Sequence, residues 1–367
     1  MSNVAHKQTT GLWWTPEGFI DAVCHHDHTV HSLVPSSKSH SSTLFLPAPV
    51  DLHVHGGGGH DCMSSEAAIR GTLKTHALHG SGALLATSVT APFQETSDFI
   101  NNAARVMQAP DEDSATLLGV HLEGPFINPD KLGAQPPHAT EIDLQQLEAW
   151  LRVGIVKVVT FAPELDPRND LIALCHKYNV RAQIGHTLCS WHQASEALAA
   201  GCGITHLYNA MSGIGHRGGG AATAALAYAD FAEIIIDGLH VDRAAFDLAK
   251  RAIPNLYSVT DGTAASGMPD GKYTLGSLSV TKSGDHVLLP DGTTAGSCLT
   301  QRRVISVLRE WDVDWHTIGA MLSAIPAQWI QHETLGRISP GAQAQWLEIE
   351  DDEPVAIWLS GERFAWR

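Results

Sequence analysis

Six histidine and carboxylate side chains stand where hydrophobic runs, each short enough to be one β-strand, come to an end. In chain order they are His53, His55, Glu123, His186, His206 and Asp261. Gly-, Pro- or Thr-rich turns follow these ends. Parallel α/β barrels build their active sites from the carboxyl ends of their strands, so side chains far apart in the chain would converge. The pattern predicts a barrel with a metal-dependent hydrolytic site at its mouth.

The alternation of strand-like and helix-like segments predicts a (β/α)8 TIM-type barrel, because strands alternating with helices form right-handed βαβ units and eight of them close a barrel. The strand-like runs are 44–55, 83–89, 116–122, 156–161, 180–184, 204–208, 234–236 and 256–260. The helix-like stretches are 65–79, 96–107, 142–153, 168–178, 191–200, 221–229, 242–253, 298–311 and 317–333.

Both ends of the chain read as a separate β domain. Residues 13–46 and 345–366 contain β-type runs without intervening helices. We expect a small β-sandwich built from both termini, residues 1–47 plus 337–367, beside a metal-dependent hydrolase barrel over 48–336. A chain of 367 residues is long enough to bury both cores.

Charge, hydropathy and cysteine content exclude several classes of protein. The formal charge of −16 argues against a nucleic-acid partner, whose phosphates need Lys and Arg. No apolar stretch approaches the roughly 20 residues that span a bilayer, and no secretory signal is visible. The six cysteines are scattered without a CxxC pair, which suits reduced thiols and excludes a Cys-rich zinc module. We expect a cytoplasmic protein without membrane or nucleic-acid partners.

Histidine is unusually abundant, at 22 of 367 residues. Five histidines lie in a Ser-rich N-terminal stretch, and we interpret them as surface side chains. Only a histidine at a strand end is taken as a candidate ligand. The five are His25, His26, His28, His31 and His40.

His53 and His55 form an HxH pair in the segment DLHVH (51–55). Residues two apart in a strand project from the same face, so both imidazoles would point into the barrel mouth. Neutral imidazoles suit zinc and ferrous iron. The pair alone does not identify a metal site, but its place at the end of the first barrel strand favours one.

Glu123, His186 and His206 form a second ligand set. Glu123 ends an otherwise apolar strand, where a carboxylate is costly to bury unless it meets a cation. His186 and His206 end the fifth and sixth strands. Three protein ligands leave one position for water, as a catalytic zinc site requires. The alternatives are a salt-bridged Glu123 and paired core histidines, and we interpret His121 as a core residue or one that supports a ligand.

Side chains near later strand ends fit proton transfer and substrate binding. Asp261 can take a proton from metal-bound water and pass it to a leaving amine, unless it is only a turn or cap residue. His240 is available to a substrate, and Asn209 can hold hydroxyl or phosphate oxygens. Arg217 offers a planar fork to phosphate, with a solvated surface arginine as the alternative. Glycines 218–220, before a helix, resemble a phosphate cradle.

These motifs together resemble the amidohydrolase superfamily, and within it the N-acetylglucosamine-6-phosphate deacetylase family. The resemblance runs through the whole barrel and weakens in the N-terminal β segment. The matching segments are DLHVHGGGGHD (51–61), HLEGPFINPDKLGAQP (121–136), IGHT (184–187), THLYNAMSG (205–213), IDGLHVD (236–242), SVTDGTAASGMPDGKYTLG (258–276) and AGSCLT (295–300).

The resemblance implies hydrolysis of the N-acetyl group of an amino-sugar 6-phosphate to acetate and a free amine. It implies one or two divalent ions per subunit, with zinc first and iron or manganese as alternatives. Asp261 would act as a ligand and as the general base and acid. The principal ion would be held by Glu123, His186 and His206. A second would be held by His53 and His55, which match the branch of the family that keeps an HxH pair.

The resemblance also implies how the substrate is held. His240 would contact the substrate and its carbonyl, and Gln135 would meet the sugar. Asn209, Ala210 and Arg217 would address the sugar phosphate. A neighbouring subunit supplies part of this pocket in the family, which implies a homodimer.

One departure from the family pattern concerns the phosphate. Glu-Pro-Gly usually follows the arginine, whereas this chain has Gly218-Gly219-Gly220, without the fixed φ of proline. The sugar therefore stays open among N-acetylglucosamine 6-phosphate, N-acetylgalactosamine 6-phosphate and unphosphorylated N-acyl sugars. Deamination or cyclic-amide hydrolysis is a further alternative, against which Glu123 in the bridging place counts. A silent barrel that only binds a partner would have lost ligands that this chain keeps.

Overall fold

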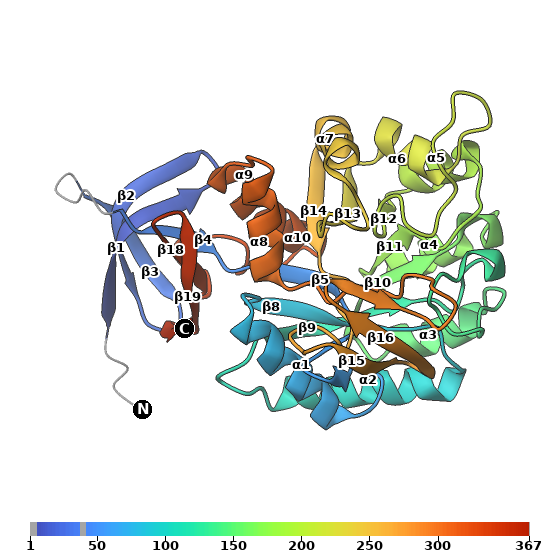
Figure 1. Ribbon diagram of the computed structural model, residues 1–367, viewed down its shortest axis with the longest axis horizontal. Coiled ribbons are helices and arrows are strands. Elements are labelled where there is room, and N and C mark those ends of the chain that lie inside the picture. Colours follow the sequence, from blue (N-terminus) through green and yellow to red (C-terminus); the bar gives the residue numbers. More distant parts are fainter. Residues whose placement is uncertain (1–5, 37–41, 367) are drawn as a thin grey trace.

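The computed structural model describes residues 6–36 and 42–366, so His40 lies outside the described part of the chain. Figure 1 shows a large α/β barrel with a smaller β domain at its side, and β1 and β19, from opposite ends of the described chain, both lie in that smaller domain. Within the described ranges, no helix is long and apolar enough to cross a membrane.

The barrel is one eight-stranded sheet in the order β14-β13-β12-β11-β10-β9-β8-β5, and its neighbouring strands are parallel. Its strands are rich in Val, Ile, Leu and Ala and are buried along most of their length, as expected when helices cover a parallel sheet. The strands are β5 (Val50–Val54), β8 (Ala83–Ser88), β9 (Thr116–Glu123), β10 (Val156–Phe161), β11 (Arg181–Ile184), β12 (Gly203–Ile204), β13 (Phe231–Ile235) and β14 (Asn255–Val259).

The first and last barrel strands close the sheet just beyond their carboxyl ends. Val54 and Gly262 form a parallel bridge. The Asp261 amide donates to the His53 carbonyl at 3.0 Å, and the His55 amide donates to the Gly262 carbonyl at 2.8 Å. The predicted barrel is confirmed, and its closure brings two of the predicted ligand segments side by side.

Helices follow the strands, and most begin at a side chain that caps free backbone amides. Ser65, Asp143, Ser190 and Asp242 each accept from an amide in the first turn of their helix. The predicted helix at 317–333 is instead two short helices joined by a π-helical turn, α9, η3 and α10. The helices are α1 (Glu66–Leu78), α2 (Phe93–Gln108), α3 (Leu144–Leu151), α4 (Asp170–Lys177), α5 (Trp191–Ala199), α6 (Ala221–Tyr228), α7 (Arg243–Ala252), α8 (Gln301–Glu310), α9 (Trp315–Gly319), η3 (Ala320–Ala324) and α10 (Ile325–Trp329), with 3-10 turns η1 (Pro129–Lys131) and η2 (Pro163–Leu165).

The predicted strand at 44–55 is in fact two strands in two different sheets. β4 (Leu44–Pro47) pairs with strands of the small domain, whereas β5 pairs with β8. Pro47 and Pro49 lack the backbone N–H that a continuous strand interior needs. The chain therefore changes sheet between Pro47 and Val50. The proposed domain limits, 1–47 plus 337–367 and 48–336, stay a prediction.

The small domain is a seven-stranded sheet in the order β20-β19-β18-β4-β1-β2-β3, so both termini contribute strands to it, as predicted. Its halves pack on each other around Trp13, Phe45 and Trp346. His26 of β2 touches Trp358 of β19 across this core, with ring centroids 5.7 Å apart. The strands are β1 (Lys7–Thr15), β2 (Gly18–His26), β3 (Val30–Pro35), β4, β18 (Trp346–Glu350), β19 (Glu353–Leu359) and β20 (Glu362–Ala365).

The surface interpretation of the N-terminal histidines is wrong for one of them. His26 is completely buried, and its Nε2 lies 3.0 Å from the hydroxyl of Thr9. His28 and His31 are exposed and His25 is half-buried. The periodicity of β2 explains the difference, because neighbouring residues of a strand face opposite sides of the sheet.

A small antiparallel sheet that the sequence analysis did not predict follows β14. Its strands pair by hairpins and bury Leu275, Val280 and Val287 against Val89 and Ala265. The strands are β15 (Gly271–Leu275), β16 (Leu278–Ser283) and β17 (His286–Leu288), and a further two-stranded ribbon joins β6 (Gly56–Gly57) to β7 (His60–Asp61).

Candidate metal centre

The predicted ligands come from the ends of separate barrel strands and meet at one place. His53 lies in β5 and Glu123 is the last residue of β9. The others follow the strands within two residues. All six are buried: His53, His55, Glu123, His186, His206 and Asp261.

One side of the centre gathers Glu123, His186 and His206. The Nε2 atoms of both histidines lie 2.9 Å from Glu123 Oε1 and 3.1 Å from each other. Nδ1 of His186 donates to the Lys131 carbonyl at 2.8 Å, so Nε2 presents its lone pair to the centre. Lone pairs of two imidazoles and one carboxylate therefore point to one spot, which is the donor set of a divalent transition metal.

The other side gathers His53, His55 and Asp261 around the second oxygen of Glu123. Glu123 Oε2 lies 3.4 Å from His53 Nε2 and 3.2 Å from His55 Nε2. Asp261 Oδ1 lies 3.4 Å and 3.2 Å from the same two nitrogens. Glu123 thus stands between two groups of ligands, and the donor set on this side fits a second ion.

Three residues of the centre have backbone conformations that side chains other than glycine rarely adopt. The φ angles of His186, His206 and Asp261 are +49°, +26° and +50°. Such conformations cost on the order of 1–3 kcal/mol each and are concentrated at functional sites. Because glycine would avoid that cost, the imidazole or carboxylate itself is needed there.

The buried charges of the centre favour a cation. Burial alone would raise the pKa of Glu123, but the imidazoles of His53 and His186 hold it well below its usual range. Burial would lower the pKa of His55, yet hydrogen bonds and charge from Asp261 and Glu123 raise it to about 9. Burial would raise the pKa of Asp261, but the charge of His53 and the hydrogen bond and charge of His55 lower it to about 2. Two ionised carboxylates are therefore held among imidazoles at a buried position.

Glu233, which the sequence analysis missed, holds two of the ligand segments in place. It is fully buried in β13, and its Oε2 lies 3.1 Å from His53 Nδ1 and 3.3 Å from the amide of His206. The hydroxyl of Tyr257 donates to its other oxygen at 3.4 Å. A lone carboxylate in an apolar strand was the signal that selected Glu123, and the same signal could have found Glu233.

His121 is a supporting residue, in agreement with its interpretation. Burial lowers its pKa to about 4, so the ring is neutral. Its Nδ1 donates to the Leu52 carbonyl at 3.0 Å, and its Nε2 accepts from the Thr160 hydroxyl at 2.7 Å. The ring also packs against His53, with centroids 4.6 Å apart. These contacts fix the orientation of the HxH segment.

A cavity of about 360 Å³ opens onto the centre. It is lined by five of the six predicted ligands, and His53, the sixth, is completely buried. The predicted substrate residues Gln135, Asn209, Ala210 and His240 also line it. Lys131, at the end of the 3-10 turn η1, lines it as well and was not predicted, since a single lysine there carries no pattern of its own.

Gln135 and His240 have defined partners beside the centre. The side-chain amide of Gln135 donates to Glu123 Oε2, and its carbonyl oxygen accepts from the Thr90 amide at 2.6 Å. His240 Nδ1 lies 2.6 Å from Asp237 Oδ2. Burial would lower the pKa of His240, but Asp237 outweighs it and raises the pKa. His240 is therefore held as a donor toward the cavity.

The structure does not bring Arg217 to the cavity. Arg217 is exposed and is not among the residues that line it. The predicted phosphate cradle in the glycine run before α6 is not formed either, because Ala221 N donates to Ser212 Oγ at 2.8 Å and Ala222 N to the Ser212 carbonyl at 3.0 Å. Gly220 is needed for this packing, since a Cβ there would lie 2.2 Å from Ser212 Cβ.

Comparison with known proteins identifies the family. The model of the Amidohydrolase family matches residues 44–355. The chain belongs to the amidohydrolase family. The match includes all eight strands of the barrel.

Individual relatives of the chain are amino-sugar-phosphate deacetylases. It is 34% identical to the N-acetylglucosamine-6-phosphate deacetylase of Bacillus subtilis, over 87% of this chain and 84% of that one. It is 32% identical to the N-acetylgalactosamine-6-phosphate deacetylase of Escherichia coli O157:H7, over 95% and 96%. A Mycobacterium smegmatis N-acetyl-D-glucosamine-6-phosphate deacetylase mutant, solved with N-acetyl-D-glucosamine-6-phosphate, matches with a TM-score of 0.88, 26% identity and coverage of 98% and 99%.

Replacing Glu123 by Gln should remove bound metal, because both groups of ligands share this carboxylate. Loss of a supporting residue already weakens metal binding about 10–100-fold. We expect a larger loss for Glu123→Gln, measured as metal content after equilibration at fixed free zinc. Glu196→Gln, on the exposed face of α5, is the matched control and should keep full metal content. Undiminished metal in Glu123→Gln would contradict the assignment.

Proposed function

We propose that the chain is a metal-dependent deacetylase that converts N-acetylglucosamine 6-phosphate to glucosamine 6-phosphate and acetate. The observation that carries the proposal is a single cavity that is lined by Glu123, Asp261 and His240. Asp261 also lies next to the HxH pair, 3.2 Å from His55 Nε2. The names of the relatives support the substrate class. We propose zinc as the first candidate for the ion, with iron and manganese as alternatives, because these metals share the same ligands.

The roles of the side chains follow from their positions. Glu123, His186 and His206 would hold the principal ion, and His53 and His55 a second. When bound, the ion supplies a Lewis acid and brings the pKa of a bound water toward neutrality.

Asp261 and His240 would carry the proton transfer and the developing charge. Asp261, whose carboxylate is ionised, accepts the proton of the attacking water. It then protonates the amide nitrogen as the C–N bond breaks. His240, oriented by Asp237, donates to the carbonyl oxygen as negative charge develops on it.

Contacts to the sugar would come from the rim of the cavity. We propose that Asn209, Ala210 and Gln135 contact the sugar, as their places in the cavity lining allow. Lys131 supplies an ammonium group on the same rim. Arg217 keeps its proposed role toward the phosphate only if its loop or a second subunit brings it to the cavity, because it is exposed in the single chain.

N-Acetylgalactosamine 6-phosphate is the second candidate substrate. The Escherichia coli relative named for that sugar covers 95% of this chain, more than the Bacillus subtilis relative does. Both candidates share the acetyl group and the 6-phosphate, so the same catalytic residues serve either one.

Acetate release from four compounds should separate these candidates. The compounds are N-acetylglucosamine and N-acetylgalactosamine, each with and without the 6-phosphate. We expect N-acetylglucosamine 6-phosphate to be turned over with the highest kcat/KM. Each unphosphorylated sugar should have a kcat/KM at least about tenfold lower than its 6-phosphate, because a charge-assisted hydrogen bond stabilises by about 1.5–3 kcal/mol. A preference for a plain sugar would contradict the proposed substrate, and absence of acetate from all four would contradict the deacetylase.

Asp261→Asn should abolish most turnover while leaving the ion at Glu123, His186 and His206. General acid–base catalysis contributes about 10²–10⁴-fold, so kcat should fall by at least about 100-fold. The matched control is Asp247→Asn on α7, whose side chain is 43% exposed in a surface ion pair with Arg243. Near-normal turnover of Asp261→Asn, with the control behaving as wild type, would exclude Asp261 as the base.

We propose a homodimer formed by the loops at the barrel mouth. Leu188, Ile214 and Leu239 are 47%, 59% and 47% exposed and lie in loops that follow β11, β12 and β13. Three large apolar side chains on one rim are typical of a protein interface when they lie together. This arrangement supports the expectation that a second subunit completes the cavity.

Light scattering tests the dimer. The wild-type chain, of 39.3 kDa, should give the mass of two chains, and Ile214→Glu should shift it toward one. Leu78→Glu, at a side chain 57% exposed on α1, is the control and should stay dimeric. A single-chain mass for the wild type would rule the dimer out.

We also propose a cytoplasmic location. All six cysteines lie in the described part of the chain and are free thiols. Unpaired cysteines suit a reducing compartment.

A further inference from the structure

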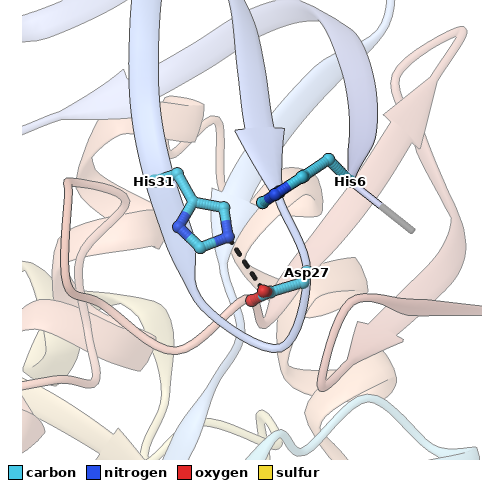
Figure 2. Close-up of side chains that lie close together, drawn as sticks. All are labelled: His6, Asp27 and His31. Carbon is cyan, nitrogen blue, oxygen red and sulfur yellow. Dashed lines mark ion pairs between the residues drawn. The ribbon is translucent and has the colours of Figure 1, made fainter. Parts of the chain in front are cut away.

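A second cluster of possible metal ligands lies in the small domain, outside the catalytic barrel. Figure 2 shows His6, Asp27 and His31 with their side chains turned toward one another. One ligand atom of each lies within 4.8 Å of the others. His31 lies in β3, and His6 and Asp27 lie directly before β1 and directly after β2, strands that Figure 1 shows in the small domain to the side of the barrel.

The folding of the sheet brings these residues together. Lys7 of β1 is paired with His26 of β2, so His6 and Asp27 are neighbours just beyond the paired ends of the two strands. His25 is paired with Ser32 and His26 with Val30, which leaves His31 as the extra residue of a β-bulge. A bulge redirects a side chain, and here it turns His31 toward Asp27.

Asp27 is held as an anion with one oxygen free for the cluster. The amide and hydroxyl of Thr29 both donate to Oδ1, at 2.8 Å and 3.1 Å. The backbone hydrogen bond from Thr29 is the main reason that the pKa of Asp27 lies well below its usual range. Oδ2 faces His31, whose Nε2 is 2.9 Å away. The carboxylate is thus oriented by an outer partner, as the ligands of metal sites are.

The neighbouring charges do not compete for the cluster. The ammonium of Lys7 pairs with Glu362 at 2.5 Å and donates to the Gly361 carbonyl. His28, next to Asp27, directs Nδ1 to the Ser360 carbonyl at 3.0 Å. An ion pair of Asp27 with His31 accounts for two members of the cluster, but an exposed pair of this kind contributes little to stability. It gives no reason for His6, whose ring meets that of His31 edge-on with centroids 5.0 Å apart.

We propose that His6, Asp27 and His31 form a site for a divalent transition metal such as Zn²⁺, separate from the catalytic centre, that ties the start of β1 to the β2–β3 turn. Two imidazoles and a carboxylate suit zinc, copper or nickel, whereas magnesium and calcium prefer oxygen ligands alone. A tetrahedral zinc ion with bonds of about 2.0–2.1 Å needs its ligand atoms about 3.4 Å apart. The distance from Asp27 Oδ2 to His31 Nε2, 2.9 Å, is already shorter than that. The side chains of His6 and His31 are exposed, so they can rotate to the required spacing.

Zinc binding by the whole chain, without a histidine tag, tests the site. At the same micromolar free Zn²⁺, wild type should bind one ion per chain more than His31→Gln or His6→Gln. The affinity for that ion should fall by at least about tenfold in each variant, by comparison with the loss caused by a missing outer partner. His25→Gln is the matched control on the same hairpin and should bind as wild type. Deacetylase turnover should be unchanged in all of them.

Hydrogen exchange tests the tie between the strands. Added Zn²⁺ should slow amide exchange at the start of β1 in wild type and in His25→Gln, and leave it unchanged in His31→Gln. Equal zinc content in wild type and both ligand variants would overturn the site. An equal loss in His25→Gln would show diffuse binding by surface histidines and would also overturn it, and unchanged exchange in wild type would overturn the tie.

Discussion

The contacts between the Glu123 carboxylate and the imidazoles around it are the interactions on which the rest of the site depends. Its two oxygens face two different groups of imidazoles, His186 with His206 and His53 with His55. A buried carboxylate is stable only with compensating positive charge or hydrogen bonds. In this chain it has the imidazoles and the Gln135 amide around it. The architecture of the barrel serves to place these imidazoles, from the ends of β5, β11 and β12, around one side chain.

Closure of the barrel brings the side chains at the ends of its first and last strands together in one site. β14 joins β5 through backbone hydrogen bonds that include Asp261 N to the His53 carbonyl. Asp51, two residues before His53, accepts from the Thr260 hydroxyl at 2.7 Å, and burial raises the pKa of Asp51 to about 6. Asp261 is thus positioned by the same contacts that close the sheet. Across the barrel, Glu233 ties His53 to the His206 segment.

Much of the fold and the ligand set follows from the sequence, because strand ends in a parallel barrel have a fixed geometry. The eight barrel strands and the six strand-end side chains are visible as local patterns in the sequence. The barrel topology then predicts that the six side chains converge. Other features depend on packing that no local pattern records. The sequence does not show that β4 and β5 belong to different sheets, that β15–β17 form beside the mouth, or that a bulge redirects His31.

The errors of interpretation have physical causes as well. His26 resembles its exposed neighbours in sequence, but the alternation of β2 turns it into the core of the small domain. The glycine run before α6 resembles an anion cradle, but Ser212 accepts hydrogen bonds from the first two amides of α6. Glu233 is a lone carboxylate in an apolar strand, as Glu123 is, but it lies within β13 and not at a strand end, so the strand-end pattern does not include it.

Anomalous scattering at the zinc edge from crystals of the zinc-loaded protein tests the central claim most directly. An ion should lie about 2.0–2.2 Å from Glu123 Oε1 and from the Nε2 atoms of His186 and His206. An ion bound in the barrel without contact to Glu123, or density showing these three side chains turned away from a common point, would contradict the account.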